Sequence, residues 1–277
     1  MACLRALERQ TCQPGRFEVV VVDNGSSPPI GSMSETFSFA RFVCEPTPGS
    51  YAARNRGIAS SRAAVLGFTD ADCLPAEDWI ERGIRAVQRL PDPGLVAGKI
   101  ELTFRNPERL TTAELFESVV AFPQAAYVRW GFSATANTFT TKAAFDAVGL
   151  FDERLKSGGD MEWGQRLRAR GFSQVYADDV RVSHPARHTL RQLLSKSRRV
   201  AGGVQQVADQ RGEGLKGLHA HAVQQLIQLK RVRASLSHQR LDTLGRKARF
   251  TTTMWLVELL QTVERYRVHH RGGVKRT

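Results

Sequence analysis

The sequence predicts an α/β fold in which a sheet is flanked by helices, followed by a basic helical extension. Short apolar runs such as 64–68 end in polar clusters, as buried strands do. Amphipathic segments such as 77–89 alternate with these runs, and this alternation is typical of α/β proteins. From residue 189 onward the strand pattern stops, and apolar residues at helical spacing alternate with arginine clusters.

Composition limits the class of protein. The chain has 277 residues, of which 42% are hydrophobic, enough for one large domain or a domain with an appendage. No apolar run approaches the length that spans a bilayer. The four cysteines show no paired, metal-type spacing, and a disulfide framework is uncommon in a domain of this size. The sequence therefore predicts a protein of the reducing cytoplasm.

The net charge of +13 is unevenly distributed. Residues 186–277 carry 19 Lys and Arg against 5 Asp and Glu, whereas residues 1–185 carry 21 against 22. The excess predicts an anionic partner for the last third, either a membrane surface or a polyanion. The alternative is a basic helical surface that faces only solvent.

The first helix and strands follow from local patterns. Residues 2–11 place leucines between charged residues and predict a short helix. The β-branched run 17–22 predicts a strand that is covered on both faces, and 41–44 predicts a shorter one. The small, polar segment 31–40 between them predicts a loop.

A polar cluster follows the first strand. Asp23 opens this cluster, and its carboxylate could bind a ribose or a base, or it could accept backbone N–H groups of the turn. A helix is predicted next at 51–61, with Ser50 as its N-cap. Arg54 and Asn55 lie in its first turns, where they could reach a phosphate or a base, or be ordinary exposed side chains.

Two carboxylates, Asp70 and Asp72, follow the apolar run 64–68. Side chains at i and i+2 of an extended segment point the same way, so both carboxylates can face one point beyond the strand. Ligands of open α/β sheets bind at this edge, and two hard oxygen ligands suit a divalent cation that also holds phosphates. The sequence thus predicts a metal–diphosphate site. The alternative is a polar loop in which Asp70 caps the next helix.

The middle of the chain continues the alternation of strands and helices. The predicted elements are, in order, a helix at 77–89, a strand at 95–104, a helix at 111–128 interrupted near Pro123, a strand at 131–141 and a helix at 142–148 that ends at Gly149.

A second acidic cluster lies around residue 160. Gly158 and Gly159 allow close backbone approach, and Asp160 and Glu162 then open a helix that runs to residue 170. Carboxylates in a first turn suit the helix dipole, but one of them could also serve as a general base. A strand at 175–183 follows and ends at His184.

The last third predicts three or more amphipathic helices. Apolar residues recur at helical spacing at 190–194, 215–227 and 254–263, with basic clusters at 198–199, 230–233 and 246–249. Such helices could lie on an anionic membrane or pack on the preceding domain.

Taken together, these stretches resemble a family 2 glycosyltransferase with the GT-A fold. The resemblance covers about residues 2–185 and rests on motifs in the family's order: Leu-Glu-Arg-Gln-Thr at 7–11, Val-Val-Val-Asp-Asn-Gly-Ser at 20–26, Ala-Arg-Asn-Arg-Gly at 53–57, Phe-Thr-Asp-Ala-Asp at 68–72, Thr-Ala-Asn at 135–137, Val-Gly-Leu-Phe-Asp-Glu at 148–153 and Gly-Asp-Met-Glu at 159–162. It implies a Rossmann-like, mixed and mainly parallel sheet in a catalytic domain at 1–188, with an extension at 189–277.

The resemblance also implies a mechanism and site residues. A sugar would pass from a nucleotide diphosphate donor, most commonly UDP, to an acceptor hydroxyl with inversion. The implied metal ligand is Asp72, which would hold Mn²⁺ or Mg²⁺ with Asp70 in support, and His184 is either a further metal ligand or a surface histidine. Asp160 would be the general base, and Asp23, Arg54 and Asn55 would lie on the donor side. The acceptor side would be formed by Asn137, Glu162 and Trp163, with a core role as the alternative for Trp163. The acceptor could be a polysaccharide, a lipid-linked sugar or a small glycoside.

Two departures from the family pattern lead to expectations. The family's sheet has a strand before its first helix, so we expect Met1 not to be the natural start, or the sequence to be a fragment. Gly159 stands where an acidic residue is common, which leaves Asp160 as the candidate base. The rival functions are a nucleotidyltransferase of similar fold, a non-catalytic protein that binds nucleic acid or another polyanion through the basic tail, and a degenerate, non-catalytic relative of the family.

Overall fold

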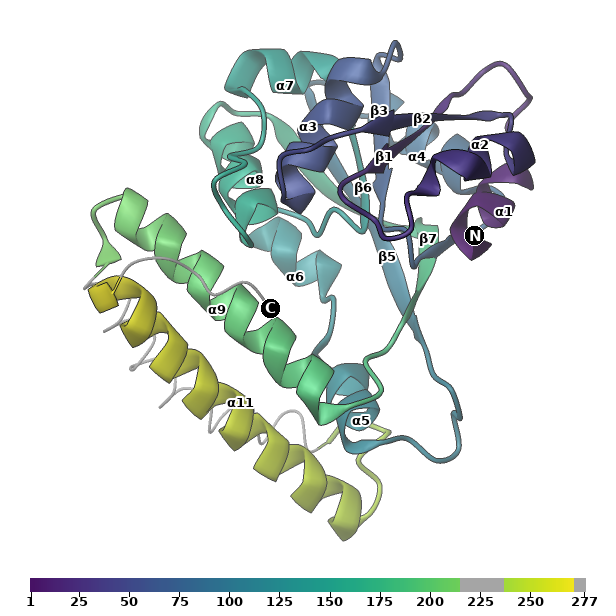
Figure 1. The fold of residues 1–277 in the computed structure, drawn as a ribbon. Helices are drawn as coiled ribbons and strands as arrows, with labels where there is room; N and C mark the ends of the chain where they lie inside the picture. The colour runs from purple at the N-terminus through teal and green to yellow at the C-terminus, as the bar shows by residue number, and fades with distance from the viewer. Residues whose placement is uncertain (215–236, 272–277) are drawn as a thin grey trace. The chain divides into compact units, whose positions relative to one another are not determined.

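The computed structural model describes residues 1–214 and 237–271, which form two compact units (Figure 1). Unit 1 comprises Met1–Glu101 and Phe122–His184, and unit 2 comprises Leu102–Ala121 and the described residues from Pro185 onward. The segment Leu102–Ala121, which the sequence-based division at residue 188 placed in the catalytic domain, is part of unit 2. Among the described helices, none combines the length and the apolar character needed to cross a membrane.

Unit 1 contains a parallel pair of strands, β1–β2, and a five-stranded sheet in the order β3-β6-β5-β7-β4. The strands are β1 (Val19–Asp23), β2 (Ala40–Cys44), β3 (Val65–Thr69), β4 (Leu74–Pro75), β5 (Pro93–Thr103), β6 (Asn137–Thr141) and β7 (Ser173–Pro185). The sequence predicted a mainly parallel sheet, but β3–β6, β5–β6 and β4–β7 pair antiparallel. Apolar patterning shows where a strand lies and not in which direction it runs, so the strands were predictable and their relative directions were not.

The helices of unit 1 largely follow the predicted pattern. They are α1 (Ala2–Glu8), η1 (Ile30–Ser32), α2 (Met33–Thr36), α3 (Ser50–Ser60), α4 (Trp79–Gln88), α6 (Gln124–Arg129), α7 (Lys142–Val148) and α8 (Gly159–Ala169). Two predictions were wrong. The expected loop at 31–40 contains η1 and α2, whose neighbour Phe37 is buried in the core. The N-cap of α3 is Gly49 and not Ser50, because the chain enters the helix at φ 145°.

The core of unit 1 packs helix against sheet. The rings of Trp79 on α4 and Phe139 on β6 lie 4.5 Å apart. Gly83 makes this contact possible, since a Cβ atom there would come within 2.2 Å of the Phe139 ring. Close helix–sheet packing of this kind holds the ends of the strands, where the polar motifs lie, in fixed positions.

Unit 2 is helical in its described part. Its helices are α5 (Thr112–Val120), α9 (Leu190–Gln210) and α11 (Leu244–Arg271), and α9 and α11 run side by side (Figure 1). Leu115, Leu193, Leu241 and Phe250 are buried in its core. The predicted helical stretch 215–227 and the basic cluster 230–233 lie outside the described residues.

Two buried carboxylates on α5 have hydrogen-bonding partners within unit 2. Glu117 accepts hydrogen bonds from Arg187 Nη1 at 2.8 Å and from Lys196 Nζ at 3.2 Å. Glu114 lies 3.2 Å from the His188 ring and caps the N-terminus of α5 in a capping box with Thr111. Buried charges are stable only when they are paired in this way.

Candidate active site

The two carboxylates after β3 face different partners. Asp70 directly follows the strand and pairs with Arg54 of α3, whose Nη2 lies 2.9 Å from Asp70 Oδ1. Ala71 and Asp72 form a turn, which the Cys73 N–H closes by donating to the Asp70 carbonyl. The prediction that both side chains face one point assumed an extended segment, and the turn removes that geometry.

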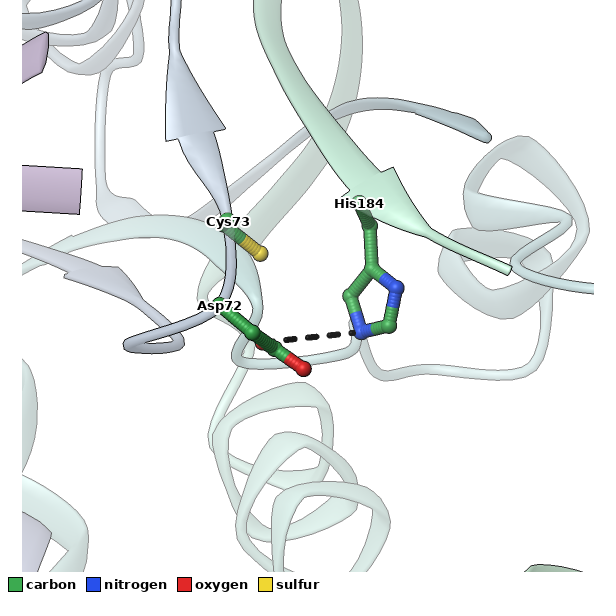
Figure 2. A group of neighbouring side chains, drawn as sticks. All are labelled: Asp72, Cys73 and His184. Atoms are coloured by element: carbon green, nitrogen blue, oxygen red, sulfur yellow. Dashed lines mark ion pairs between the residues drawn. The ribbon is translucent and has the colours of Figure 1, made fainter. Parts of the chain in front are cut away.

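Asp72 belongs to a cluster with Cys73 and His184 (Figure 2). Asp72 Oδ1 lies 3.8 Å from His184 Nε2, and the potential ligand atoms of all three residues are within 4.8 Å of one another. The Asp72 side chain is 60% exposed, whereas that of His184 is 5% exposed. The cluster therefore has one open side, toward which a substrate could supply further ligands.

Strand pairing brings His184 to this place. β4 pairs antiparallel with β7, and Leu74 lies opposite Ser183. Behind His184, the Phe122 ring packs with its centroid 4.8 Å from that of the imidazole. Phe122 has a φ of 50°, a conformation that bulky residues rarely adopt and that often marks a functional site.

The donor set of this cluster fits a divalent cation. A carboxylate oxygen, an imidazole nitrogen and a sulfur are all metal ligands, and the spacing of their atoms allows them to converge on one ion. Burial, reinforced by the Asp70 charge, raises the pKa of the Cys73 thiol to about 12. Without a cation, this thiol stays protonated at neutral pH.

Asp160 stands in the first turn of α8 and is held by Tyr51 of α3. The Tyr51 hydroxyl donates to Asp160 Oδ1 at 3.2 Å and accepts from the Gly159 N–H at 2.8 Å. Burial raises the pKa of Asp160, which the positive charge of Arg54 partly opposes. Burial and the Asp160 charge raise the pKa of Tyr51, so this phenol remains a hydrogen-bond donor.

Gly159 is required for this contact. A Cβ atom at residue 159 would lie 2.7 Å from two atoms of the Tyr51 ring. The glycine that stands in place of the family's usual acidic residue thus makes room for a tyrosine against Asp160.

Arg54 links the two acidic motifs. Its guanidinium pairs with Asp70 and also lies 5.6 Å from the centroid of the Tyr51 ring. Contacts therefore run without a break from Asp70 through Arg54 and Tyr51 to Asp160.

The end of β1 forms a structured turn. Asp23 accepts hydrogen bonds from the backbone N–H groups of Ser26 at 2.9 Å and Ile30 at 3.2 Å, and the Ser26 bond is the main reason why the Asp23 pKa is lowered. Asn24 ties this turn to the start of α3, because its Oδ1 accepts from the Gly49 N–H at 2.8 Å. The structure thus gives Asp23 the turn role that the sequence left open, and its predicted contact with a nucleoside stays a prediction.

Other predicted site residues are engaged in the scaffold. Asn137 is fully buried and bridges strands, donating to the carbonyls of Lys99 and Val180 and accepting from Trp79 Nε1. Its predicted acceptor contact needs correction, because no surface of this residue faces solvent. The amide of Asn55 forms two hydrogen bonds with the Phe151 backbone, so the structure places it in packing and not beside the carboxylates.

The two remaining acceptor-side residues also have internal partners. Trp163 is 2% exposed, stacks on Phe145 at 4.4 Å and donates to the Gly149 carbonyl, which matches the core alternative. Glu162 forms an ion pair with Arg166 one helical turn later, at 2.7 Å. Both side chains thus have partners within the protein, and their predicted contact with an acceptor stays a prediction.

Sequence reasoning missed Tyr51, Cys73 and Phe122. The cysteines were judged by their spacing from one another, and a mixed site with an aspartate and a histidine has no such spacing. No local sequence pattern marked Tyr51 as a site residue, because its partner Asp160 lies 109 positions away along the chain.

Comparison with known proteins gives a consistent picture. Residues 2–148 match the family described as glycosyl transferase family 2. The chain is 36% identical to the glycosyltransferase AglE of Haloferax volcanii over 211 residues, which covers 74% of this chain and 68% of AglE. It is 26% identical to the pre-mycofactocin glycosyltransferase of Mycobacterium tuberculosis over 194 residues, 65% of this chain but only 40% of that protein.

A solved structure extends the likeness to the fold. The mannosyltransferase PcManGT from Pyrobaculum calidifontis, determined in complex with GDP-Man and Mn²⁺, superposes with a TM-score of 0.62 at 15% identity. The match covers 95% of this chain and 82% of that one, and so it shows a shared GT-A-like fold with C-terminal helices. The chain belongs to glycosyl transferase family 2 and is a nucleotide-sugar-dependent glycosyltransferase.

Proposed function

We propose that this glycosyltransferase inverts the anomeric centre of its donor sugar and uses Asp160 as the general base. Asp160 would take the proton of an acceptor hydroxyl while that oxygen attacks the anomeric carbon and the bond to the nucleoside diphosphate breaks. The carboxylate supports this role because burial raises its pKa toward the working pH, where a base is most effective. Tyr51 and Arg54 would keep it oriented and ionised.

The donor diphosphate would lie at the cluster of Asp72 and His184. These residues would hold a Mn²⁺ or Mg²⁺ ion, which supplies stabilisation of the negative charge on the leaving group. The observation that carries the proposal is the unbroken series of contacts from Asp70 beside this cluster to Asp160. Asp23 lies at the C-terminal end of β1, as Asp70 lies just after the C-terminal end of β3, and it would orient the nucleoside.

The donor nucleotide would be a uridine or guanosine diphosphate. UDP is the expectation from the family resemblance, and GDP is its rival because PcManGT was crystallised with GDP-Man. Nucleotidyl transfer and polyanion binding without catalysis were the two main rival functions. Membership of a glycosyltransferase family removes the support for both of them as the main function of this chain.

Thermal unfolding of the full chain tests the donor site. We expect UDP or GDP with Mn²⁺, at about 100 times the dissociation constant, to add about 2.7 kcal/mol of stability. The shift should require both metal and nucleotide, and Asp72→Ala should abolish it. Asp146→Ala, which removes an exposed carboxylate on α7 outside the cluster, is the matched control and should keep it. A metal-independent shift, or none with any nucleotide, would contradict the proposal.

We also infer that the acceptor is a glycan or lipid-linked sugar at the cytoplasmic face of an anionic membrane, as in cell-envelope polysaccharide synthesis. The support is the positive charge of residues 186–277. A row of exposed apolar side chains on α11 adds to it: Trp255, Leu259, Val263 and Tyr266. Basic helices with such an apolar face bind membrane surfaces.

A further inference from the structure

The cluster at the end of β3 contains a residue that the proposed metal site has not yet used. Cys73 is fully buried, yet its sulfur lies within 4.8 Å of ligand atoms of both Asp72 and His184 (Figure 2). On β4, Leu74 pairs with Ser183 of β7; Cys73 directly precedes Leu74, and His184 directly follows Ser183. The sheet itself therefore holds the thiol against the imidazole.

The donor set has consequences for the choice of metal. Mg²⁺ takes oxygen ligands almost exclusively, whereas sulfur and imidazole together favour borderline cations such as Co²⁺ and Zn²⁺. An Asp–His pair with substrate phosphates would bind Mn²⁺ or Mg²⁺. An added sulfur ligand would weaken the preference for Mg²⁺ relative to softer divalent cations.

We propose that Cys73 is a third protein ligand of the metal and shifts the preference of the site from Mg²⁺ toward softer divalent cations. The inference rests on the proposed metal site at Asp72 and His184. As the sulfur–metal bond forms, the thiol loses its proton to solvent, and no oxidation or reduction takes place. The exposed side of the cluster, at Asp72, stays available for the donor phosphates.

Cobalt absorption of the full chain tests the proposal without an activity assay. Co²⁺ bound to the wild-type chain should show ligand-field bands and, in addition, a thiolate-to-cobalt charge-transfer band in the near ultraviolet. Cys73→Ser should lose the charge-transfer band and keep the ligand-field bands. Its affinity for Co²⁺ should fall about tenfold or more, since even loss of a partner behind a metal ligand costs about 10–100-fold. Its affinity for Mg²⁺ should stay nearly unchanged.

Cys3→Ser is the matched control. Cys3 is also buried, and its thiol lies 3.7 Å from the Asp70 carbonyl, next to the cluster but outside it. This variant should keep the charge-transfer band. If Cys73→Ser fails to fold, a chain with Cys3, Cys12 and Cys44 all changed to Ser retains only the proposed ligand, and the band must persist in it.

The outcomes separate this inference from the proposed function. Ligand-field bands without a charge-transfer band in the wild-type chain would overturn the role of Cys73 and leave the Asp72–His184 site intact. Absence of all cobalt bands would overturn the metal site itself. A charge-transfer band that survives in Cys73→Ser would assign the sulfur to another cysteine and would also refute the proposal.

Discussion

At the scale of single residues, the chemistry depends on how Asp160 is held. The carboxylate faces the Tyr51 hydroxyl, the Arg54 charge and, from α6, Tyr127, whose pKa is raised to about 12 by burial and by the Asp160 charge. Burial favours the protonated acid, whereas the phenol donor and the guanidinium favour the carboxylate. The balance between these effects sets the pH at which Asp160 can act as a base.

Tyr51→Phe should shift that balance toward the acid. Without the phenol donor the carboxylate loses a hydrogen bond, so the Asp160 pKa should rise and the acidic limb of the kcat/KM profile should move to higher pH. Hydrogen bonds to charged groups contribute roughly 1.5–3 kcal/mol, so the expected shift is about 1–2 pH units. The measurement is nucleoside diphosphate release as a function of pH.

Tyr127→Phe is the matched control for this prediction. It removes a phenol near the same carboxylate, and the acidic limb should then move by a few tenths of a unit at most. Equal shifts in both variants, or a uniform loss of rate without a shift, would contradict a specific role for the Tyr51 hydroxyl.

At the scale of elements, strand ends and helix starts position the groups that react. The short strand β4 pairs with β7 and fixes His184 beside Cys73, and the first turn of α8 presents Asp160 to α3. Glycine at 159 permits this approach, as described above. In unit 2, α11 is the long element, and its exposed side chains at 255, 259, 263 and 266 follow the helical repeat and form one face.

The apolar face of α11 should bind anionic vesicles. Trp255 and Leu259 are 57% and 64% exposed, so changing either to Ser costs the folded protein little while removing apolar area available to a membrane. Each change should lower partitioning to phosphatidylserine-containing vesicles about tenfold, because burial of a large apolar side chain contributes roughly 1.5–3 kcal/mol. Cosedimentation measures this partitioning.

Trp130→Ser serves as the control for the α11 variants. Trp130 is 50% exposed in unit 1 and should not affect vesicle binding. Binding that is equally strong on neutral vesicles, or that is unaffected by the α11 changes, would refute the membrane proposal.

At the scale of the whole molecule, unit 2 depends on a buried charge network that spans distant segments. Glu117, 2% exposed, joins α5 to Arg187 and to Lys196 on α9. Burial by itself raises the pKa of Glu117, but Lys196 and Arg187 outweigh it and lower the pKa below its usual value. The pKa of Glu114 is also lowered, by hydrogen bonds from Thr111 and His188 that outweigh burial.

Stability should therefore decrease in acid. A carboxyl with a lowered pKa contributes stability that is present above its unfolded pKa of about 4.5 and is lost as the pH falls through the lower, folded value. The free energy of unfolding, measured by urea titration and circular dichroism, should decrease as the pH is lowered from about 5. Glu117→Gln should be less stable at pH 7 by roughly 1–3 kcal/mol and should show a weaker pH dependence.

Glu108→Gln, an exposed glutamate in the same unit, should leave both the stability and its pH dependence nearly unchanged. If the free energy of unfolding of Glu117→Gln decreases in acid as much as that of the wild-type chain, the Glu117 carboxylate does not cause the acid dependence of stability.

The sequence by itself determined the family, the order of the motifs and most helices and strands of unit 1. These features reside in contiguous residues, such as Phe-Thr-Asp-Ala-Asp at 68–72, whose local patterns predict a strand end with carboxylates. The physical reason is that burial periodicity and turn chemistry act over a few residues. The roles of Asp160 as general base and of His184 as metal ligand came from the family resemblance and stay predictions.

Only the tertiary structure decided which side chains meet. It placed Tyr51 against Asp160 across 109 positions, brought Cys73 close to His184 next to the β4–β7 pairing, and buried Asn137 between strands. It also set the direction of the antiparallel strands and assigned Leu102–Ala121 to unit 2. Strand partners and packing neighbours are chosen by the competition of the whole chain for burial and hydrogen bonds, so no local pattern records them.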